Sequence, residues 1–338
     1  MLDEFVLARK TKTEKTQSDY MKMVQRLRQQ ASRWYIRQGL EYVLQSGNTV
    51  SDEQLVYWLV SYAPEVSKQT YTLYKSAIVF AIQNEELALF LINYGSELSY
   101  KSKDRTPQFA VKAKSINAKD WQKLMAHLDK ANGQWDKIIK RWLQAGLLCG
   151  LRPVEWTQSE LLDTPNGLIL HVKNAKNTNG RSNGEYRDIV LSGMNDKDIA
   201  IIKENLENIQ LASQNGEYEN MLVCCQNRLR RRWAKRRMPF GKRKRHITLY
   251  SARHQFSADA KRSGMKREEV SALMGHGVDK TAILHYGKKQ YGRSGAIKVK
   301  PKQEQVATVK RTSDRAFMES RLAVLRATKQ MEHQINKK

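Results

Sequence analysis

Apolar residues recur at helical spacing near the start of the chain and predict an amphipathic helix over residues 20–38. Three or four residues separate the members of this stripe, as one face of a helix requires. They are Tyr20, Val24, Leu27, Ala31 and Trp34. The opposite side is basic and carries Lys22, Arg26, Arg33 and Arg37. Such a face is either a solvated helix surface or a contact with phosphates.

Two further helix starts follow in the same region. Ser51 precedes an apolar segment at residues 55–62, and Ser67 precedes a longer one that we expect to run as one helix to about residue 93 and to end at Gly95. Serine is a favoured N-cap because its hydroxyl accepts a hydrogen bond from an unpaired helix amide. Residues 1–98 are therefore expected to form an all-helical domain.

A basic segment without apolar periodicity follows at residues 99–116 and is predicted to be a linker that follows a phosphate backbone. Its cations are Lys101, Lys103, Arg105, Lys112 and Lys114. Asn117 then has the character of an N-cap and opens a second domain. We expect this domain to cover residues 117–295, before a polar tail and a C-terminal helix at residues 296–338.

The second domain is predicted to be mixed but mostly helical. A helix at residues 135–149 ends at Gly150, and two short strands at residues 168–172 and 187–191 flank a turn rich in Gly, Asn and Ser. The expected fold class is mainly α: a helical N-terminal domain, a mostly helical second domain with a small β-hairpin or sheet, and a final helix.

The charge of the chain points to nucleic acid as its partner. The formal net charge is +26, yet residues 1–98 hold 11 basic and 11 acidic residues, so the whole surplus lies beyond residue 98. Eleven of the eighteen residues at 228–245 are Lys or Arg, interleaved with Trp233 and Phe240. This run is either a solvated helix, a localisation tag or a phosphate contact, which we favour in so basic a chain. The expected contacts are Arg230, Arg231, Lys235, Arg243 and Arg245.

Other classes of protein are disfavoured. The three cysteines form no CxxC pair, and no cluster of carboxylates has metal-ligand spacing, so we expect neither a metal nor another cofactor. The N-terminus lacks a signal-peptide pattern, and the most apolar stretch, residues 77–94, is interrupted by Asn84, Glu85 and Glu86. We expect a cytoplasmic protein that is associated with the nucleoid and not with a membrane.

Three short motifs carry candidate chemistry. They are GLRPVE at residues 150–155, YSARH at residues 250–254, and GH at residues 275–276 followed ten residues later by Tyr286. Together they resemble the tyrosine recombinase (phage integrase) family, whose three boxes read GLRxxE, HxxRH and LGH followed by a tyrosine. The motifs that carry the resemblance lie within residues 150–287. In the N-terminal half no motif matches, and the likeness is limited to the expected helical domain, because members of the family have a helical DNA-clamping domain there.

This resemblance implies a reaction at a DNA phosphodiester. Tyr286 would be the nucleophile that forms a 3′-phosphotyrosyl bond, while Arg152 and Arg253 would hold the phosphate. Arginine suits this task because its planar fork stays charged and grips two oxygens. A phenol can attack phosphorus and later depart, so rejoining needs no ATP.

The resemblance also implies supporting roles. A lysine on the hairpin would protonate the leaving 5′-oxygen, and Lys176 fits the spacing better than Lys173, which remains the alternative. His276 would donate a hydrogen bond to the phosphate. Glu155 would orient active-site groups and His254 would give structural support.

Tyr250 departs from the family pattern, because its position usually carries histidine or, in some members, lysine. A phenol can donate a hydrogen bond to a phosphate oxygen but brings no positive charge near neutral pH. Tyr250 is also a rival nucleophile, which we discount because Tyr286 has the expected distance from His276.

The resemblance implies a site-specific recombinase or integrase of a mobile genetic element that acts on double-stranded DNA as a homo-oligomer, from dimer to tetramer. One alternative is a DNA-binding protein with an inactive site, and another is a relaxing enzyme similar to type IB topoisomerases. A C-terminal helix at about residues 314–334 either contacts a neighbouring protomer or packs on its own domain.

Overall fold

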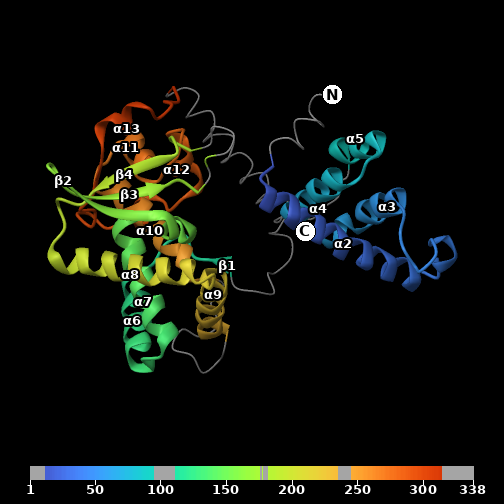
Figure 1. Ribbon diagram of the computed structural model, residues 1–338, viewed down its shortest axis with the longest axis horizontal. Coiled ribbons are helices and arrows are strands. Elements are labelled where there is room, and N and C mark those ends of the chain that lie inside the picture. The colour runs from blue at the N-terminus through green and yellow to red at the C-terminus, as the bar shows by residue number, and fades with distance from the viewer. Residues whose placement is uncertain (1–11, 95–110, 176, 178–181, 235–244, 314–338) are drawn as a thin grey trace, which may run out of the picture. The chain divides into compact units, whose positions relative to one another are not determined.

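The computed structural model (Figure 1) describes residues 12–94, 111–175, 177, 182–234 and 245–313. Lys176, most of the expected linker, part of the basic run and the expected C-terminal helix lie outside the described residues. The chain divides into two compact units, Met1–Gln108 and Phe109–Lys338. The fold is mainly α with one small antiparallel sheet, as the sequence predicts.

The regular elements described in the first unit are helices, joined by short loops of which one contains an isolated β-bridge between Gln45 and Thr49. The helices are α2 (Glu14–Arg37), α3 (Asp52–Tyr62), α4 (Lys68–Ala81) and α5 (Glu85–Asn93), with short 3-10 helices at Glu41–Val43 and Ala63–Glu65. Ser51 and Ser67 cap α3 and α4 as expected. The single long helix expected after Ser67 is wrong: Ile82 leaves the helical conformation, and the Asn84 side chain caps a new helix by accepting from the Leu87 amide.

The apolar stripe of α2 lies in the core of the first unit. Val24, Leu27 and Ala31 are buried, and Tyr20 and Trp34 pack against the core from its margin. Tyr35, which the predicted stripe leaves out, is also buried. The four cations of the opposite face are exposed, so this helix presents a basic surface.

The second unit surrounds its sheet with helices. The helices are α6 (Ala118–Ala131), α7 (Gln134–Cys149), α8 (Asp196–Gln214), α9 (Tyr218–Ala234), α10 (Leu249–Arg262), α11 (Arg267–Leu273), α12 (Lys280–His285) and α13 (Gln303–Ala307), with 3-10 helices η3 (Pro153–Gln158) and η4 (Lys289–Tyr291). Asn117 caps α6 as expected. In Figure 1 α8 runs below the sheet, while α11 and α13 lie above it.

Four strands form the antiparallel sheet in the order β2-β3-β4-β6. They are β2 (Ser159–Thr164), β3 (Gly167–Lys173), β4 (Tyr186–Val190) and β6 (Lys300–Pro301). The two predicted strands correspond to β3 and β4. A separate parallel pair joins β1 (Val111–Lys112) to β5 (Arg245–His246), so the end of the expected linker is held against the chain just before α10.

Helices α7 and α10 pack closely because glycine faces the contact. A Cβ on Gly146 would lie 2.9 Å from the Ala252 Cβ. Gly150 ends α7 in the left-handed region at φ 68°, and a Cβ there would lie 2.3 Å from the Phe256 ring. This approach brings the segment after α7 against the middle of α10, where the first two motifs lie.

We expect Gly150→Ala to lower the free energy of unfolding by about 2–5 kcal/mol, because it combines the backbone strain of a left-handed alanine with a steric clash with Phe256. Gly216→Ala is the matched control. Gly216 has a φ of 72° and no atom within 4 Å of the added Cβ, so only the backbone strain of about 1–2 kcal/mol should appear. Urea unfolding measures both losses, and equal losses would contradict the close contact.

Candidate active site

Four elements of the second unit position the residues of the three motifs. Arg152 directly precedes η3 and lies two residues after Gly150, which ends α7. Arg253 lies in the middle of α10, and His276 follows α11. Tyr286 is the residue at which α12 ends.

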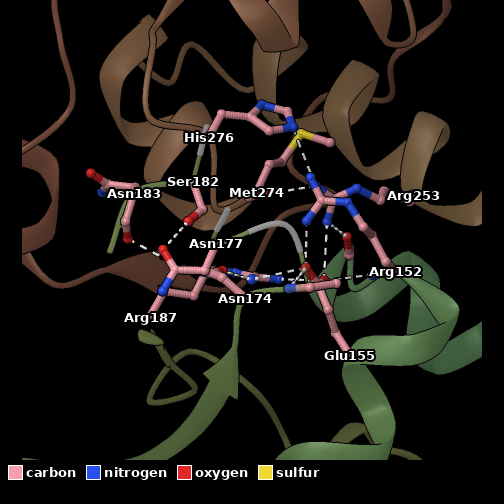
Figure 2. A network of polar contacts seen from close by, with 12 residues as sticks. Arg152, Glu155, Asn174, Asn177, Ser182, Asn183, Arg187, Arg253, Met274 and His276 are labelled. Carbon is pink, nitrogen blue, oxygen red and sulfur yellow. Dashed lines mark hydrogen bonds and ion pairs between the residues drawn. The ribbon is translucent and has the colours of Figure 1, made fainter. Parts of the chain in front are cut away.

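Glu155 connects the arginines of the site (Figure 2). Its carboxylate is buried and forms ion pairs with Arg152, Arg187 and Arg253. The Arg187 Nη2 lies 2.8 Å and the Arg253 Nη1 3.5 Å from Glu155 Oε2. The Arg152 amide also donates to Oε2 at 2.7 Å. Burial opposes the charged carboxylate, but the three guanidinium groups hold the pKa of Glu155 well below its usual range.

This cluster carries a surplus of positive charge. Three guanidinium groups face one carboxylate, and all four side chains are buried or nearly so. The Nε atoms of Arg152 and Arg253 have no hydrogen-bond partner among the described residues. Buried cations in excess of their counter-ions favour an anion. The cluster therefore has the charge and the free donors that a phosphate group would need.

Arg187 is a site residue that the sequence analysis missed. It is fully buried on β4 and donates from Nε to the Leu273 carbonyl at 2.9 Å. It also donates to the Asn174 side chain, whose Nδ2 in turn binds the Gly184 carbonyl at 3.0 Å. A lone arginine in an alternating strand pattern looks like a solvated residue, so no local signal reveals this position. Arg187 ties the β3–β4 hairpin to Glu155.

Gly275 fits tightly against the same hairpin. Its φ of 62° lies in the left-handed region, and a Cβ would lie 2.3 Å from Asn174 Oδ1 and 2.8 Å from Arg187 Nη1. Only glycine combines this conformation with this contact. The glycine before His276 is therefore explained by the backbone and by the packing of the turn.

Arg253 is held by main-chain oxygens and by His276. It donates from Nη1 to the Gly150 carbonyl at 2.7 Å and from Nη2 to the Met274 carbonyl at 2.5 Å. Nη2 also lies 3.3 Å from His276 Nε2. Burial and Arg253 hold the pKa of His276 well below 6.5, so the ring is neutral and Nε2 accepts. The proton of His276 then lies on Nδ1, which has no partner among the described residues and is a free donor.

Tyr286 lies against these cations. The Arg253 Cζ is 5.3 Å from the centroid of its ring, and the His276 ring centroid is 5.0 Å away. The Tyr286 Oη lies 3.0 Å from the Tyr250 Oη. Burial raises the pKa of the Tyr286 phenol, but Arg253, the hydrogen bond with Tyr250, and Arg152 lower it to about 8. The arginines thus stabilise the phenolate, which is the nucleophilic form.

Tyr250 and His254 complete the surroundings of this phenol. Burial raises the pKa of Tyr250, so of the two phenols Tyr286 loses its proton first. The His254 ring lies 5.0 Å from the Tyr286 ring. Burial and the nearby Lys112 and Lys114 lower the pKa of His254 to about 3, which keeps it neutral.

Lys261 is a second residue that the sequence analysis missed. It is buried on α10, and its Nζ donates to the Ala282 carbonyl and to the Gly287 carbonyl, each at 2.7 Å. These carbonyls lie on either side of Tyr286 in the sequence. Gly287 is also confined, since a Cβ would lie 2.3 Å from the His254 carbonyl. Lys261 therefore fixes the backbone that carries the nucleophile candidate.

The other predicted residues lie in different places. Lys176 lies outside the described residues, and Lys173 forms an ion pair with Glu185 at 3.6 Å. Lys112 lies in β1 beside Tyr250, closer to the site than a linker residue is expected to be. Lys22, Arg26, Arg33 and Arg37 belong to the first unit.

The basic run at residues 228–245 is only partly described. Arg230 and Arg231 are exposed on α9, whereas Arg228 pairs with Asp136 at 2.7 Å. Arg245 contributes its backbone to β5. Lys101, Lys103, Arg105, Lys235 and Arg243 lie outside the described residues.

The described residues contain neither a group suited to hold a metal ion nor a helix suited to cross a membrane. Within those residues, no group of three or more His, Cys, Asp or Glu side chains is arranged to hold a metal ion. No described helix combines the length and the apolar character needed to cross a membrane.

No family model matches the sequence, and a comparison with curated proteins gives no match. Among solved structures, the fold is similar to that of lambda integrase. A lambda integrase tetramer bound to a Holliday junction has a TM-score of 0.47 and 17% identity, over 86% of this chain and 76% of that chain. A lambda integrase dimer bound to a COC′ core site has a TM-score of 0.47 and 16% identity, over 85% and 74% of the two chains. This likeness assigns no role to any residue.

Glu155→Gln is expected to lower the free energy of unfolding by about 3–5 kcal/mol, because it leaves three buried guanidinium groups without their counter-charge. Glu160→Gln, at an exposed position of β2, is the control and should change stability by less than about 0.5 kcal/mol. Urea unfolding at neutral pH measures both. A loss at Glu155 no larger than at Glu160 would contradict the carboxylate's place as the counter-ion of the cluster.

The phenol of Tyr286 should titrate with a midpoint near pH 8, about two units below the ordinary tyrosine value. Phenolate absorbance of the folded protein, summed over its 14 tyrosines, follows this titration. In Tyr286→Phe the step near pH 8 should be absent. Tyr250→Phe should move the midpoint to higher pH, because the hydrogen bond from Tyr250 stabilises the phenolate. An unaltered titration curve in Tyr286→Phe would rule out this assignment.

Proposed function

We propose that the protein is a DNA strand transferase of the tyrosine recombinase type, with Tyr286 as its nucleophile. The observation that carries this proposal is the convergence of the Tyr286 phenol with Arg152 and Arg253 around one site. Arg152 and Tyr286 are 134 positions apart in the sequence. Arg253, the hydrogen bond with Tyr250, and Arg152 together lower the pKa of the phenol to about 8. An activated phenol beside paired guanidinium groups suits attack on a phosphodiester.

The reaction follows from these positions. The Tyr286 oxygen bonds to phosphorus as the bond from phosphorus to the 5′-oxygen breaks, which leaves a 3′-phosphotyrosyl link and a 5′-hydroxyl. Arg152 and Arg253 neutralise the charge that grows on the non-bridging oxygens. The free Nδ1 proton of His276 supports its role as a further donor to the phosphate. Lys176 is the proposed proton donor to the leaving oxygen, and attack by a 5′-hydroxyl reverses the step.

The proposed substrate is double-stranded DNA. The net charge of +26 supports it, as do the exposed arginines and lysine on α2 and the exposed Arg230 and Arg231 on α9. We propose that one unit, residues 1–108, clamps the duplex while the other acts on it. Exchange of strands between two sites needs several protomers, so the working form is a homo-oligomer on DNA. A site-specific recombinase or integrase of a mobile element is the function proposed within this class.

A suicide DNA substrate tests the proposal, because a nick close to the cleaved phosphate lets the 5′-hydroxyl fragment diffuse away and traps the covalent intermediate. Wild-type protein should form a covalent adduct that denaturing electrophoresis detects. Tyr286→Phe should form none, since it lacks the attacking oxygen, whereas Tyr250→Phe should still form the adduct. Random genomic fragments nicked at many positions serve as substrate where the target sequence is not yet known.

Three outcomes decide between the classes of function. Binding of DNA without any adduct would favour a DNA-binding protein with an inactive site. An adduct that persists in Tyr286→Phe and disappears in Tyr250→Phe would assign the nucleophile to the rival phenol. Relaxation of a plasmid without a special site would favour an enzyme similar to type IB topoisomerases.

A further inference from the structure

Lys112 lies beside the two phenols of the candidate active site, although it belongs to a segment far from the three motifs in sequence. Its Nζ is 4.3 Å from the centroid of the Tyr250 ring. The Tyr250 hydroxyl in turn lies 3.0 Å from that of Tyr286. Among the residues that the structure describes, Lys112 forms no ion pair with a carboxylate, so its charge faces the phenols and the solvent.

The backbone fixes this position. Lys112 pairs with His246 in the parallel β1–β5 ladder, and the next amide, that of Ala113, donates to the His246 carbonyl at 2.8 Å. His246 is two residues before Thr248, the N-cap of α10. The strand therefore anchors Lys112 to the helix that carries Tyr250 and Arg253.

The other groups around the two phenols are either paired with a carboxylate or neutral. Arg152 and Arg253 are both engaged with Glu155, and Tyr250 is a neutral group that can exchange a hydrogen bond but cannot compensate a negative charge. His254 and His276 are neutral as well, because burial lowers the pKa of each. Lys112 is the lysine whose ammonium group lies over the Tyr250 ring, and it therefore adds a positive charge beside the two phenols.

We propose that Lys112 is a further catalytic residue of this site: its ammonium group stabilises the Tyr286 phenolate across the Tyr250 ring and contacts the scissile phosphate of bound DNA. This inference rests on the proposed function. Lys112 forms no covalent bond in the step. The Tyr286 proton leaves to solvent, and its oxygen bonds to phosphorus as the bond to the 5′-oxygen breaks.

Burial and exposure support both parts of this role. The side chain of Lys112 is exposed enough to reach a phosphate, while partial burial lowers its pKa and the Tyr286 phenol opposes that shift. The same attraction between the ammonium group and the phenolate oxygen partly offsets the lowered pKa of Lys112 and favours the ionised form of Tyr286. The groups that face Tyr286 come from every element packed against it: Tyr250, Arg253 and His254 of α10, Arg152 before η3, His276 after α11, and Lys112 of β1.

Single-turnover cleavage of the suicide substrate by saturating protein tests the proposal. Lys112→Met should reduce the rate of adduct formation by about 10- to 100-fold, a loss typical of removing one transition-state donor at a partly exposed position. Lys112→Arg, which keeps the charge, should restore most of the rate. The control is Lys130→Met at the exposed end of α6, which removes the same charge elsewhere in the same unit and should cleave at the wild-type rate.

A second measurement needs no DNA. Phenolate absorbance of the free protein should show that Lys112→Met moves the Tyr286 midpoint to higher pH, whereas Lys130→Met leaves it unmoved. A role limited to backbone binding would instead lower the salt slope of DNA binding by about 0.9 and leave both the saturated rate and the midpoint unchanged.

The two measurements separate this inference from the proposed function. If wild type and Lys130→Met form the adduct and Lys112→Met forms it equally fast, the inference fails and the proposed function stands. If wild type forms no adduct, the proposed function fails and the catalytic role of Lys112 fails with it. An unmoved midpoint in Lys112→Met overturns the inference whatever the DNA experiment gives.

Discussion

The candidate site depends on one buried carboxylate that holds three guanidinium groups. Glu155 pairs with Arg152, Arg187 and Arg253, which come from the segment after α7, from β4 and from α10. Without it, three like charges in a region of low dielectric would repel one another and would be unstable in the folded protein. One carboxylate is enough to hold the arginines in place and too little to neutralise them. The remaining positive charge lowers the pKa of Tyr286 and is available to an anion.

The arrangement couples the sheet to the helices. Arg187 reaches from β4 to the carboxylate and to the end of α11, and Asn174 extends the same contacts into the hairpin (Figure 2). Gly275 allows the close approach at the turn before His276. A distortion of the hairpin would therefore reach the guanidinium groups through a few hydrogen bonds and not through a long path.

Much of the fold could be predicted from the sequence, because caps and periodicity are local signals. Ser51, Ser67 and Asn117 each mark a helix start that the structure contains. The break at Asn84 was missed, because Asn84, Glu85 and Glu86 interrupt the apolar stretch over a length that one exposed turn of a continuous helix would also explain. The short β1–β5 pair was also missed, because two-residue strands have no pattern of their own.

The candidate site was predicted only where a motif contains the residue. Arg152, Arg253, His276 and Tyr286 stand in recognisable boxes, and the structure brings them together. Arg187, Lys261 and the position of Lys112 depend on contacts between segments distant in sequence. A buried arginine or lysine has the same local appearance as a solvated one, so only the three-dimensional packing distinguishes them.

The contact of Lys261 with two main-chain oxygens has a consequence for the loop that carries Tyr286. Because Lys261 donates to the carbonyls of both Ala282 and Gly287, the backbone on either side of Tyr286 is held directly. Substitutions at residues 283–285 leave both of these carbonyl oxygens in place, because the oxygens belong to the main chain of other residues. The position of the phenol beside Arg253 is therefore coupled to α10 through the main chain as well as through the ring of Tyr286.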